Sequence, residues 1–142
     1  MLVRLMNEED IDQVCRIEME LFSQPWKSED FLSMMFHEDN IFLVVELEGR
    51  VIAYCGLVGI IDEGHISNVA VSKEHQHKGV AYKMLRELIA LGRKRDLISF
   101  TLEVRIGNKK AIDLYKRLGF RNSGIRPNFY LYPKEDALIM WL

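Results

Sequence analysis

Two helices are predicted at the start of the chain, where apolar residues recur every three or four positions. The first begins after Asn7, a favourable N-cap that precedes three acidic residues, and continues to about Phe22. Its apolar face consists of Ile11, Val14, Ile17 and Leu21. The segment Ser23–Trp26 interrupts this pattern, and Ser28 is expected to cap a second, short helix that continues through Phe36.

Continuous apolar runs follow, and they predict three consecutive β-strands. The runs Ile41–Leu47 and Arg50–Gly59 are separated by Glu48-Gly49, which is typical of a two-residue hairpin turn. A third strand, His65–Val71, is expected after a loop at Ile60–Gly64. Together these segments predict an antiparallel meander.

The third strand leads through a polar loop into a helix, and such a junction is a place to hold an anion. The loop Ser72–Lys78 ends at Gly79, and the helix that follows fades around Gly92–Asp96. The first turn of a helix has unpaired N–H groups, and small residues such as Gly79 and Ala81 let a bulky anion approach them. The pattern is neither a Walker motif nor a dinucleotide fingerprint, and it also fits an ordinary strand-to-helix connection.

The second half of the chain predicts a parallel strand pair, a helix and two further strands. Ile98–Val104 is expected to be a buried strand, parallel to the third strand because a helix connects the two. Asn108 then caps a helix that ends at Gly119, a left-handed C-cap. Its apolar face consists of Ala111, Leu114, Tyr115 and Leu118. A strand begins at Phe120, and a last apolar run covers Ala137–Leu142.

Length and composition fit one mixed α/β domain over residues 1–142. The formal net charge of −2 leaves no overall electrostatic footprint for nucleic acid. The apolar runs are too short to span a bilayer, and the first residues lack the apolar stretch of a signal peptide. We therefore expect a cytoplasmic protein that binds neither nucleic acid nor membrane.

The cysteines and histidines do not predict a metal site or a disulfide. Cys15 and Cys55 lie in a helical pattern and an apolar strand, where they fit small buried hydrophobic residues. His75 and His77 have no nearby cysteine or carboxylate cluster, so they form a poor zinc signature.

Three residues stand out from their apolar surroundings or from a loop. Glu103 lies inside an apolar strand, where a carboxylate is costly unless it is paired, solvated or used. Three explanations for Glu103 are open: it faces the polar side of the strand, it pairs with a neighbouring arginine such as Arg105 or Arg93, or it takes part in chemistry. Tyr115 either packs at the edge of the core or acts in a site. Trp26 either lines a pocket or fills the core.

Several segments, in this order along the chain, resemble the GNAT superfamily of N-acetyltransferases. They are Gln76-His77-Lys78-Gly79-Val80-Ala81, Leu102-Glu103-Val104-Arg105, and the segment from Asn108 through Tyr115 to Leu118-Gly119-Phe120. Within the superfamily the chain is most similar to RimI-type ribosomal-protein alanine N-acetyltransferases. The supporting segments are Pro25-Trp26, Asn68-Val69-Ala70-Val71, Asn128-Phe129-Tyr130 and Glu135-Asp136-Ala137. Pro127 departs from the pattern, since a basic residue is common at that position.

The resemblance implies the GNAT fold, a mostly antiparallel central sheet with a splayed parallel strand pair and helices on both faces. It implies that acetyl-CoA, without any metal, binds between the splayed strands. Pantetheine would pair with the backbone of Val69 and Val71, and the pyrophosphate would lie on the amides of His77–Tyr82. The implied cofactor-binding residues are Val69, Ala70, Val71, Gln76, His77, Lys78, Gly79, Val80, Ala81, Tyr82 and Asn108.

The resemblance also implies direct acetyl transfer to the N-terminal amine of a protein, an N-terminal alanine of a small-subunit ribosomal protein. Glu103 would be the general base and Tyr115 the general acid, while N–H groups around Val69–Val71 would polarise the carbonyl. An α-amine has a pKa of about 8, against about 10.4 for lysine, so a carboxylate base favours an N-terminus. The expected acceptor wall consists of Trp26, Phe129 and Tyr130.

Two other functions stay open at this point. The same chemistry could act on a polyamine, an aminoglycoside or another small amine. A non-catalytic acetyl-CoA-binding module is the second alternative, and the presence of both Glu103 and Tyr115 argues against it.

Overall fold

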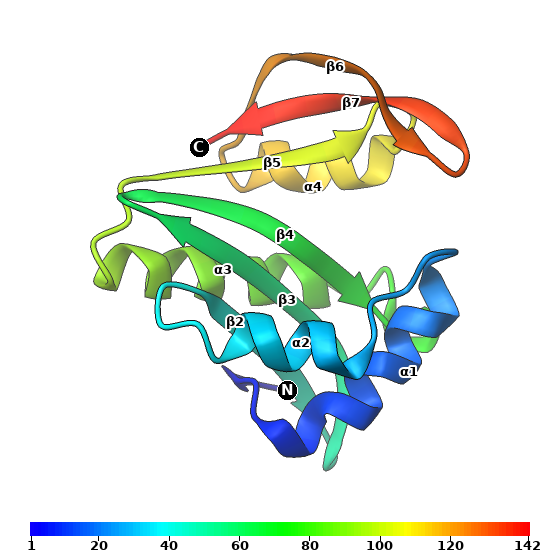
Figure 1. Ribbon diagram of the computed structural model, residues 1–142, viewed down its shortest axis with the longest axis vertical. Helices are drawn as coiled ribbons and strands as arrows, with labels where there is room; N and C mark the ends of the chain where they lie inside the picture. Colours follow the sequence, from blue (N-terminus) through cyan, green and yellow to red (C-terminus); the bar gives the residue numbers. More distant parts are fainter.

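The computed structural model describes all 142 residues. The chain folds into a seven-stranded sheet with helices on both faces (Figure 1). The strands are β1 (Leu2–Leu5), β2 (Ile41–Leu47), β3 (Arg50–Ile60), β4 (Glu63–Val71), β5 (Ser99–Arg105), β6 (Arg121–Leu131) and β7 (Lys134–Trp141). The helices are α1 (Ile11–Leu21), α2 (Ser28–Met35), α3 (Val80–Lys94) and α4 (Lys109–Arg117). The strand order across the sheet is β1-β2-β3-β4-β5-β7-β6. None of the helices combines the length and the apolar character that crossing a bilayer requires.

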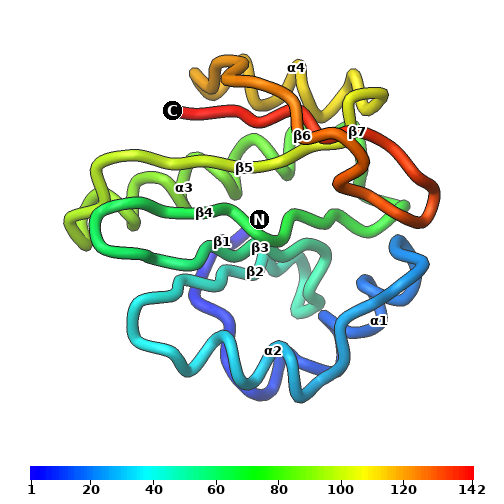
Figure 2. Tube along the Cα trace, turned by 45° about the horizontal axis from the view of Figure 1, so that its top comes forward, coloured from blue at the N-terminus to red at the C-terminus, as the bar shows by residue number.

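The core consists of two clusters of apolar side chains, one on each face of the sheet. Figure 2 shows α3 on one side of the strands and α1 and α2 on the other. Strand β2 is continuously apolar because its side chains alternate between the two clusters. Phe42 and Val44 join the cluster beneath α1 and α2, whereas Leu43 and Val45 join the larger cluster beneath α3. Because both faces are covered, the usual alternation of polar and apolar residues disappears.

The parallel strands β4 and β5 pair only at their beginnings and then diverge (Figure 1). The paired residues are Glu63, Gly64 and His65 of β4 with Ser99, Phe100 and Thr101 of β5. On the other edge of β4, Asn68 pairs with Gly56 and Ile66 pairs with Leu57, so Ser67 is an extra, bulged residue. A bulge bends its strand and increases the local twist, which turns the end of β4 away from β5.

Most sequence-based expectations for the fold are confirmed. The mixed α/β sheet with one splayed parallel pair is present, as is the Glu48-Gly49 hairpin turn, in which both residues have positive φ. Asn7 and Asn108 cap helical segments through their side chains, and Gly119 has the left-handed conformation expected of a C-cap.

The N-terminal strand β1 was not predicted, and the cap of α2 was predicted wrongly. Strand β1 has no fully buried residue, so its short pattern carries little signal before it pairs with β2. Ser28 is the first residue of α2 rather than its cap. Lys27 holds the cap position, and the Asp30 carboxylate accepts a hydrogen bond from its N–H at 2.8 Å.

The ends of two hairpins also differ from the prediction. The expected loop Ile60–Gly64 is only a two-residue turn, because Ile60 still pairs with Glu63. Strand β7 begins at Lys134 rather than Ala137, since Lys134 pairs with Leu131. In both places exposed polar residues belong to a strand through backbone pairing that a hydrophobic pattern does not reveal.

Candidate active site

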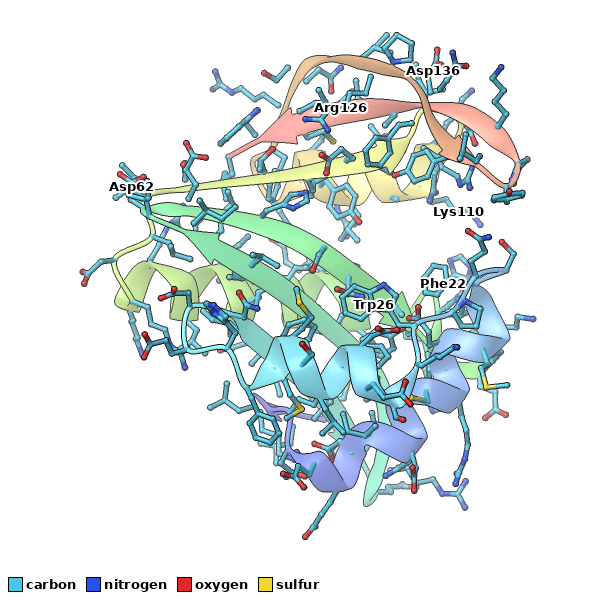
Figure 3. All side chains as sticks on the ribbon, in the orientation of Figure 1. Phe22, Trp26, Asp62, Lys110, Arg126 and Asp136 are labelled. Carbon is cyan, nitrogen blue, oxygen red and sulfur yellow. The ribbon has the colours of Figure 1, made fainter.

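A cavity of about 540 Å³ opens where β4 and β5 diverge, and we call it the cleft cavity. Its walls include Ile66–Val69 of β4, Leu102–Arg105 of β5 and Phe129–Tyr132 at the end of β6. Trp26, from the loop between α1 and α2, closes the opposite side. Figure 3 shows Trp26 and Phe22 toward the open end of the strand pair, whereas Asp62 marks the closed end.

A second cavity of about 650 Å³, the loop cavity, lies where β4 leads into α3. It is lined by Val69–Val71, by His75–His77, by Gly79–Tyr82 and by one side of α4. Val69 and Asn108 line both cavities, so the two spaces adjoin at the end of β4. A molecule that fills the loop cavity can therefore reach into the cleft cavity.

The beginning of α3 is built as a cradle for an anion. Gly79 precedes the helix with φ +80°, and no side chain caps the first turn. A Cβ atom at Gly79 would meet nothing within 4 Å, so its positive φ rather than crowding favours glycine there. Lys110, Asp113 and Arg117 of α4 also line the loop cavity, and together these three side chains leave a net positive charge there. The free N–H groups, the helix dipole and this positive charge fit a diphosphate.

The loop before α3 is fixed by local hydrogen bonds. The Gln76 side chain donates to the Val71 carbonyl at 2.9 Å, and Ser72 Oγ lies 2.8 Å from His75 Nδ1. His77 has positive φ, which lets the chain turn into the helix. These contacts hold the loop against the end of β4.

Glu103 points from β5 into the cleft cavity and is paired with residues from two other strands. Its Oε2 lies 2.5 Å from His65 Nε2 of β4, and its Oε1 lies 3.7 Å from an Arg126 Nη1 of β6. The Glu103 side chain is only 13% exposed. The sequence predicted neither His65 nor Arg126 as a site residue, because their meeting with Glu103 depends on the register of β4 with β5 and on the pairing of β6 and β7 with β5.

The two arginines named as possible partners of Glu103 are occupied elsewhere, and the arginine that lies near it is Arg126. Arg105 pairs with Glu135, with Nη1 3.1 Å from Oε1. Arg93 lies over the ring of Phe100 on the α3 side of the sheet. Glu103 therefore faces the cavity, and neither arginine neutralises it.

Tyr115 lies deep in the cleft cavity on α4, where it is 8% exposed. Its ring packs edge-on against Phe120, with centroids 6.0 Å apart. Burial, with smaller contributions from Tyr130 and Cys55, raises the pKa of its phenol well above the ordinary value. The phenol therefore keeps its proton at neutral pH, the form that a proton donor needs.

Trp26 serves in both of the ways left open by the sequence. It packs against Phe31, with ring centroids 5.2 Å apart, and it also lines the cleft cavity. Its backbone N–H donates to Glu18 Oε2 at 2.9 Å, and the other oxygen of Glu18 is hydrogen-bonded to the Tyr54 hydroxyl. Burial, reinforced by Glu18, raises the pKa of Tyr54. Glu18 is thus a buried anchor for this wall, and no feature of the sequence pointed to it.

The structure brings the predicted site residues together in two groups. The expected catalytic and acceptor residues Glu103, Tyr115, Trp26, Phe129 and Tyr130 all line the cleft cavity. The loop cavity is lined by the expected cofactor residues Val69, Ala70, Val71, Gln76, His77, Gly79, Val80, Ala81, Tyr82 and Asn108. Lys78 is the exception, because it is exposed and lines neither cavity. No group of three or more His, Cys, Asp or Glu side chains is arranged to hold a metal ion.

Comparison with known proteins identifies the family. The Acetyltransferase (GNAT) family matches residues 11–120. This chain belongs to the GNAT family. The GNAT chain is 36% identical over 141 residues to a putative [ribosomal protein bS18]-alanine N-acetyltransferase of Bacillus subtilis, covering 99% of this chain and 93% of the relative. It is 33% identical to the [ribosomal protein bS18]-alanine N-acetyltransferase of Escherichia coli, covering 94% and 90%.

A solved structure agrees with these sequence relatives. The crystal structure of the ribosomal-protein-S18-alanine N-acetyltransferase from Escherichia coli superposes with a TM-score of 0.91 at 31% identity. The match covers 99% of this GNAT chain and 92% of that one. The predicted family, the acyltransferase class and the fold are therefore confirmed. GNAT acetyltransferases take their acetyl group from acetyl-CoA, whose diphosphate the loop cavity fits.

Proposed function

We propose that this protein transfers the acetyl group of acetyl-CoA to the N-terminal α-amine of a protein, an N-terminal alanine of a small-subunit ribosomal protein. The relatives named for alanine acetylation of bS18 match nearly the whole chain. The observation that carries the proposal is the meeting of the two cavities at Val69 and Asn108, with Glu103 and Tyr115 in the wall of the cleft cavity. Donor and acceptor can thus meet beside a carboxylate and a phenol.

Glu103 acts as the base in this proposal. Its carboxylate, directly or through one water, accepts a proton from the α-ammonium group of the acceptor. The neutral nitrogen then forms a bond to the carbonyl carbon of the thioester. An α-amine, with a pKa of about 8, gives up this proton more readily than a lysine side chain at about 10.4.

Tyr115 acts as the acid when the carbon–sulfur bond breaks. The departing thiolate takes the phenol proton, the nitrogen of the new amide releases its remaining extra proton to water, and water returns a proton to Tyr115. The Tyr115 phenol is protonated at neutral pH and so has a proton to give, although burial, which raises its pKa, makes it a weaker acid than a free phenol. Backbone N–H groups near Val69 stabilise the negative charge that develops on the carbonyl oxygen.

Trp26, Phe129 and Tyr130 form the acceptor wall. Phe129 and Tyr130 pack edge to face, with centroids 5.0 Å apart, and both line the cleft cavity. An aromatic wall suits a peptide N-terminus, whose first side chain is small and whose backbone is planar.

Intact-mass analysis of ribosomal protein bS18 with an N-terminal alanine tests the proposal. The protein, acetyl-CoA and bS18 are incubated together, and we expect one added acetyl group at the N-terminus. The same incubation with Glu103→Gln is the control and should leave bS18 almost unmodified. Acetylation of spermidine or an aminoglycoside with no change in bS18 would favour a small-amine acceptor. Tight binding of acetyl-CoA without transfer to any amine would favour a non-catalytic module.

A further inference from the structure

Arg105, the last residue of β5, holds the β6–β7 hairpin in place. Its Nη1 donates to the Pro133 carbonyl at 2.8 Å and to Glu135 Oε1 at 3.1 Å, and its Nη2 donates to the Tyr132 carbonyl at 3.1 Å. The guanidinium carbon also lies 4.3 Å from the centroid of the Tyr130 ring. One side chain therefore contacts both strands of the hairpin and the turn between them.

Glu135 extends these contacts to the segment after β5. Its second oxygen, Oε2, accepts a hydrogen bond from the Gly107 N–H at 2.8 Å. Charged hydrogen bonds of this kind are stronger than neutral ones, particularly where the partners are partly shielded from water. Arg105 and Glu135 are 30% and 26% exposed, so this pair is shielded in that sense.

Besides Arg105 and Glu135, β6 is joined to the sheet through its pairing with β7 and through Arg126, whose Nη1 lies 3.7 Å from Glu103 Oε1. Every residue of β6 is exposed except Tyr130, which is half-buried. The register with β7 is interrupted between Arg126 and Tyr130, and Asn128 within this bulge has positive φ. A strand without buried apolar side chains gains little from the hydrophobic effect, so polar contacts must fix its position.

The position of Arg105 on β5 links this hairpin to the proposed base. Glu103 and Arg105 are two residues apart on one strand, so their side chains lie on the same face, about 7 Å apart along the strand. Phe129 and Tyr130, which the hairpin carries, line the cavity that Glu103 faces. Strand β5 therefore bears the base and also sets the position of the aromatic wall beside it.

We propose that Arg105 is a positioning residue that holds the aromatic acceptor wall at a fixed place relative to Glu103. It governs how the acceptor amine and its first residues are held, and it does not touch the reacting atoms or the donor. The proposal rests on the proposed function in one respect, since the cleft cavity must be where the acceptor amine binds. A lysine cannot replace this arginine, because one ammonium group lacks the planar fork that reaches two carbonyls, a carboxylate and a ring together.

Steady-state kinetics of Arg105→Gln and Arg105→Lys, with acetyl-CoA and an N-terminal alanine peptide, test this role. We expect the KM for the peptide to rise about tenfold or more in both variants, because a small displacement of the wall misplaces the acceptor. The KM for acetyl-CoA should change less than twofold. Arg121→Gln is the matched control, an exposed arginine on β6 without an ion pair, and should match the unsubstituted protein. An unchanged peptide KM, or an equal rise in both KM values, would overturn the proposal.

Amide hydrogen exchange gives a second measurement that does not need activity. In Arg105→Gln, exchange across residues 126–136 should accelerate about tenfold, while exchange in β2 and β3 stays unchanged. Glu135→Gln should accelerate exchange in the same region. Adding it to Arg105→Gln should have little further effect, because both substitutions break the same Arg105–Glu135 contacts. Unchanged exchange in Arg105→Gln would contradict the proposal. If exchange accelerates in Arg105→Gln but the unsubstituted protein acetylates no alanine N-terminus, Arg105 still holds the hairpin and the proposed function is wrong.

Discussion

The loop cavity and the cleft cavity adjoin, yet they are built in different ways. The loop cavity takes most of its wall from one continuous stretch, Val69–Tyr82, and presents backbone N–H groups at the start of α3. The cleft cavity draws its wall from α1, β4, β5, α4 and β6, and presents side chains. The first therefore depends on backbone conformation, and the second depends on tertiary packing that brings distant side chains together.

This difference predicts which substitutions affect which substrate. Changes of side chain in the cleft cavity should reduce turnover or acceptor binding and leave donor binding intact. Changes of backbone conformation in the loop cavity should weaken donor binding and leave the chemistry intact. Three substitutions test this division in order of expected effect, and the alkaline stability of the protein tests the burial of Tyr115.

Glu103→Gln should have the largest effect, a fall in kcat of about 10²- to 10⁴-fold, because the acceptor amine loses its proposed base. The amide nearly preserves the shape of the carboxylate, so the KM for acetyl-CoA should stay within about twofold. Steady-state kinetics with an N-terminal alanine peptide measures both values. A kcat equal to that of the unsubstituted protein at every pH would remove Glu103 from the mechanism.

Tyr115→Phe should lower kcat by about ten- to a hundredfold, less than Glu103→Gln, because a thiolate is already a good leaving group. The unsubstituted protein should not lose activity through ionisation of Tyr115 as pH rises from 7 to 10, since burial raises the pKa of this phenol. Rates over this pH range, measured with both proteins, check the two statements. A Tyr115→Phe variant with full kcat would show that another group protonates the thiolate.

Gly79→Ala should act on the loop cavity alone. Alanine at φ +80° costs about 1–2 kcal/mol in backbone strain, so the loop should shift and the KM for acetyl-CoA should rise roughly five- to thirtyfold. The KM for the peptide should stay within about twofold. Ala90→Gly on the exposed side of α3 is a control for a general weakening of that helix. Equal changes in both KM values would mean that the cavities are not independent.

The alkaline stability of the protein should show the smallest effect. Burial raises the pKa of Tyr115 and Tyr54 above the ordinary value of 10.0, so above pH 10 the unfolded chain loses protons that the folded chain retains. The contribution of these two tyrosines to the free energy of unfolding is therefore fully present below pH 10 and is lost as the pH rises above it. In Tyr115→Phe this loss should be smaller by about 1.4 kcal/mol per pH unit, as urea unfolding between pH 8 and 11 would measure. Identical slopes in the two proteins would contradict the assigned burial of Tyr115.

The two cavities also differ in how far the sequence could predict them. The loop cavity follows from neighbours in the chain, such as a glycine before a helix, and all but Lys78 of its expected residues line it. Asn108 and Gly119 were predictable for the same reason, since a cap depends on contacts within one turn.

The cleft cavity was predictable only in part. Glu103 stood out because a carboxylate interrupts an apolar strand, but its partners depend on long-range geometry. His65 meets Glu103 through the register of β4 and β5, and Glu18 reaches Trp26 only because α1 packs beside the loop. Strand β1 was missed because its pairing with β2, rather than its own composition, decides its conformation.

Inhibition by a bisubstrate conjugate tests most directly whether the two cavities form one continuous path. The conjugate joins coenzyme A through an acetyl linker to the N-terminal amine of an alanine peptide. It should compete with acetyl-CoA and also with the peptide, and it should bind far more tightly than coenzyme A alone, because it occupies both cavities through their junction at Val69 and Asn108. Competition with acetyl-CoA but not with the peptide would place the acceptor outside the cleft cavity and contradict the account.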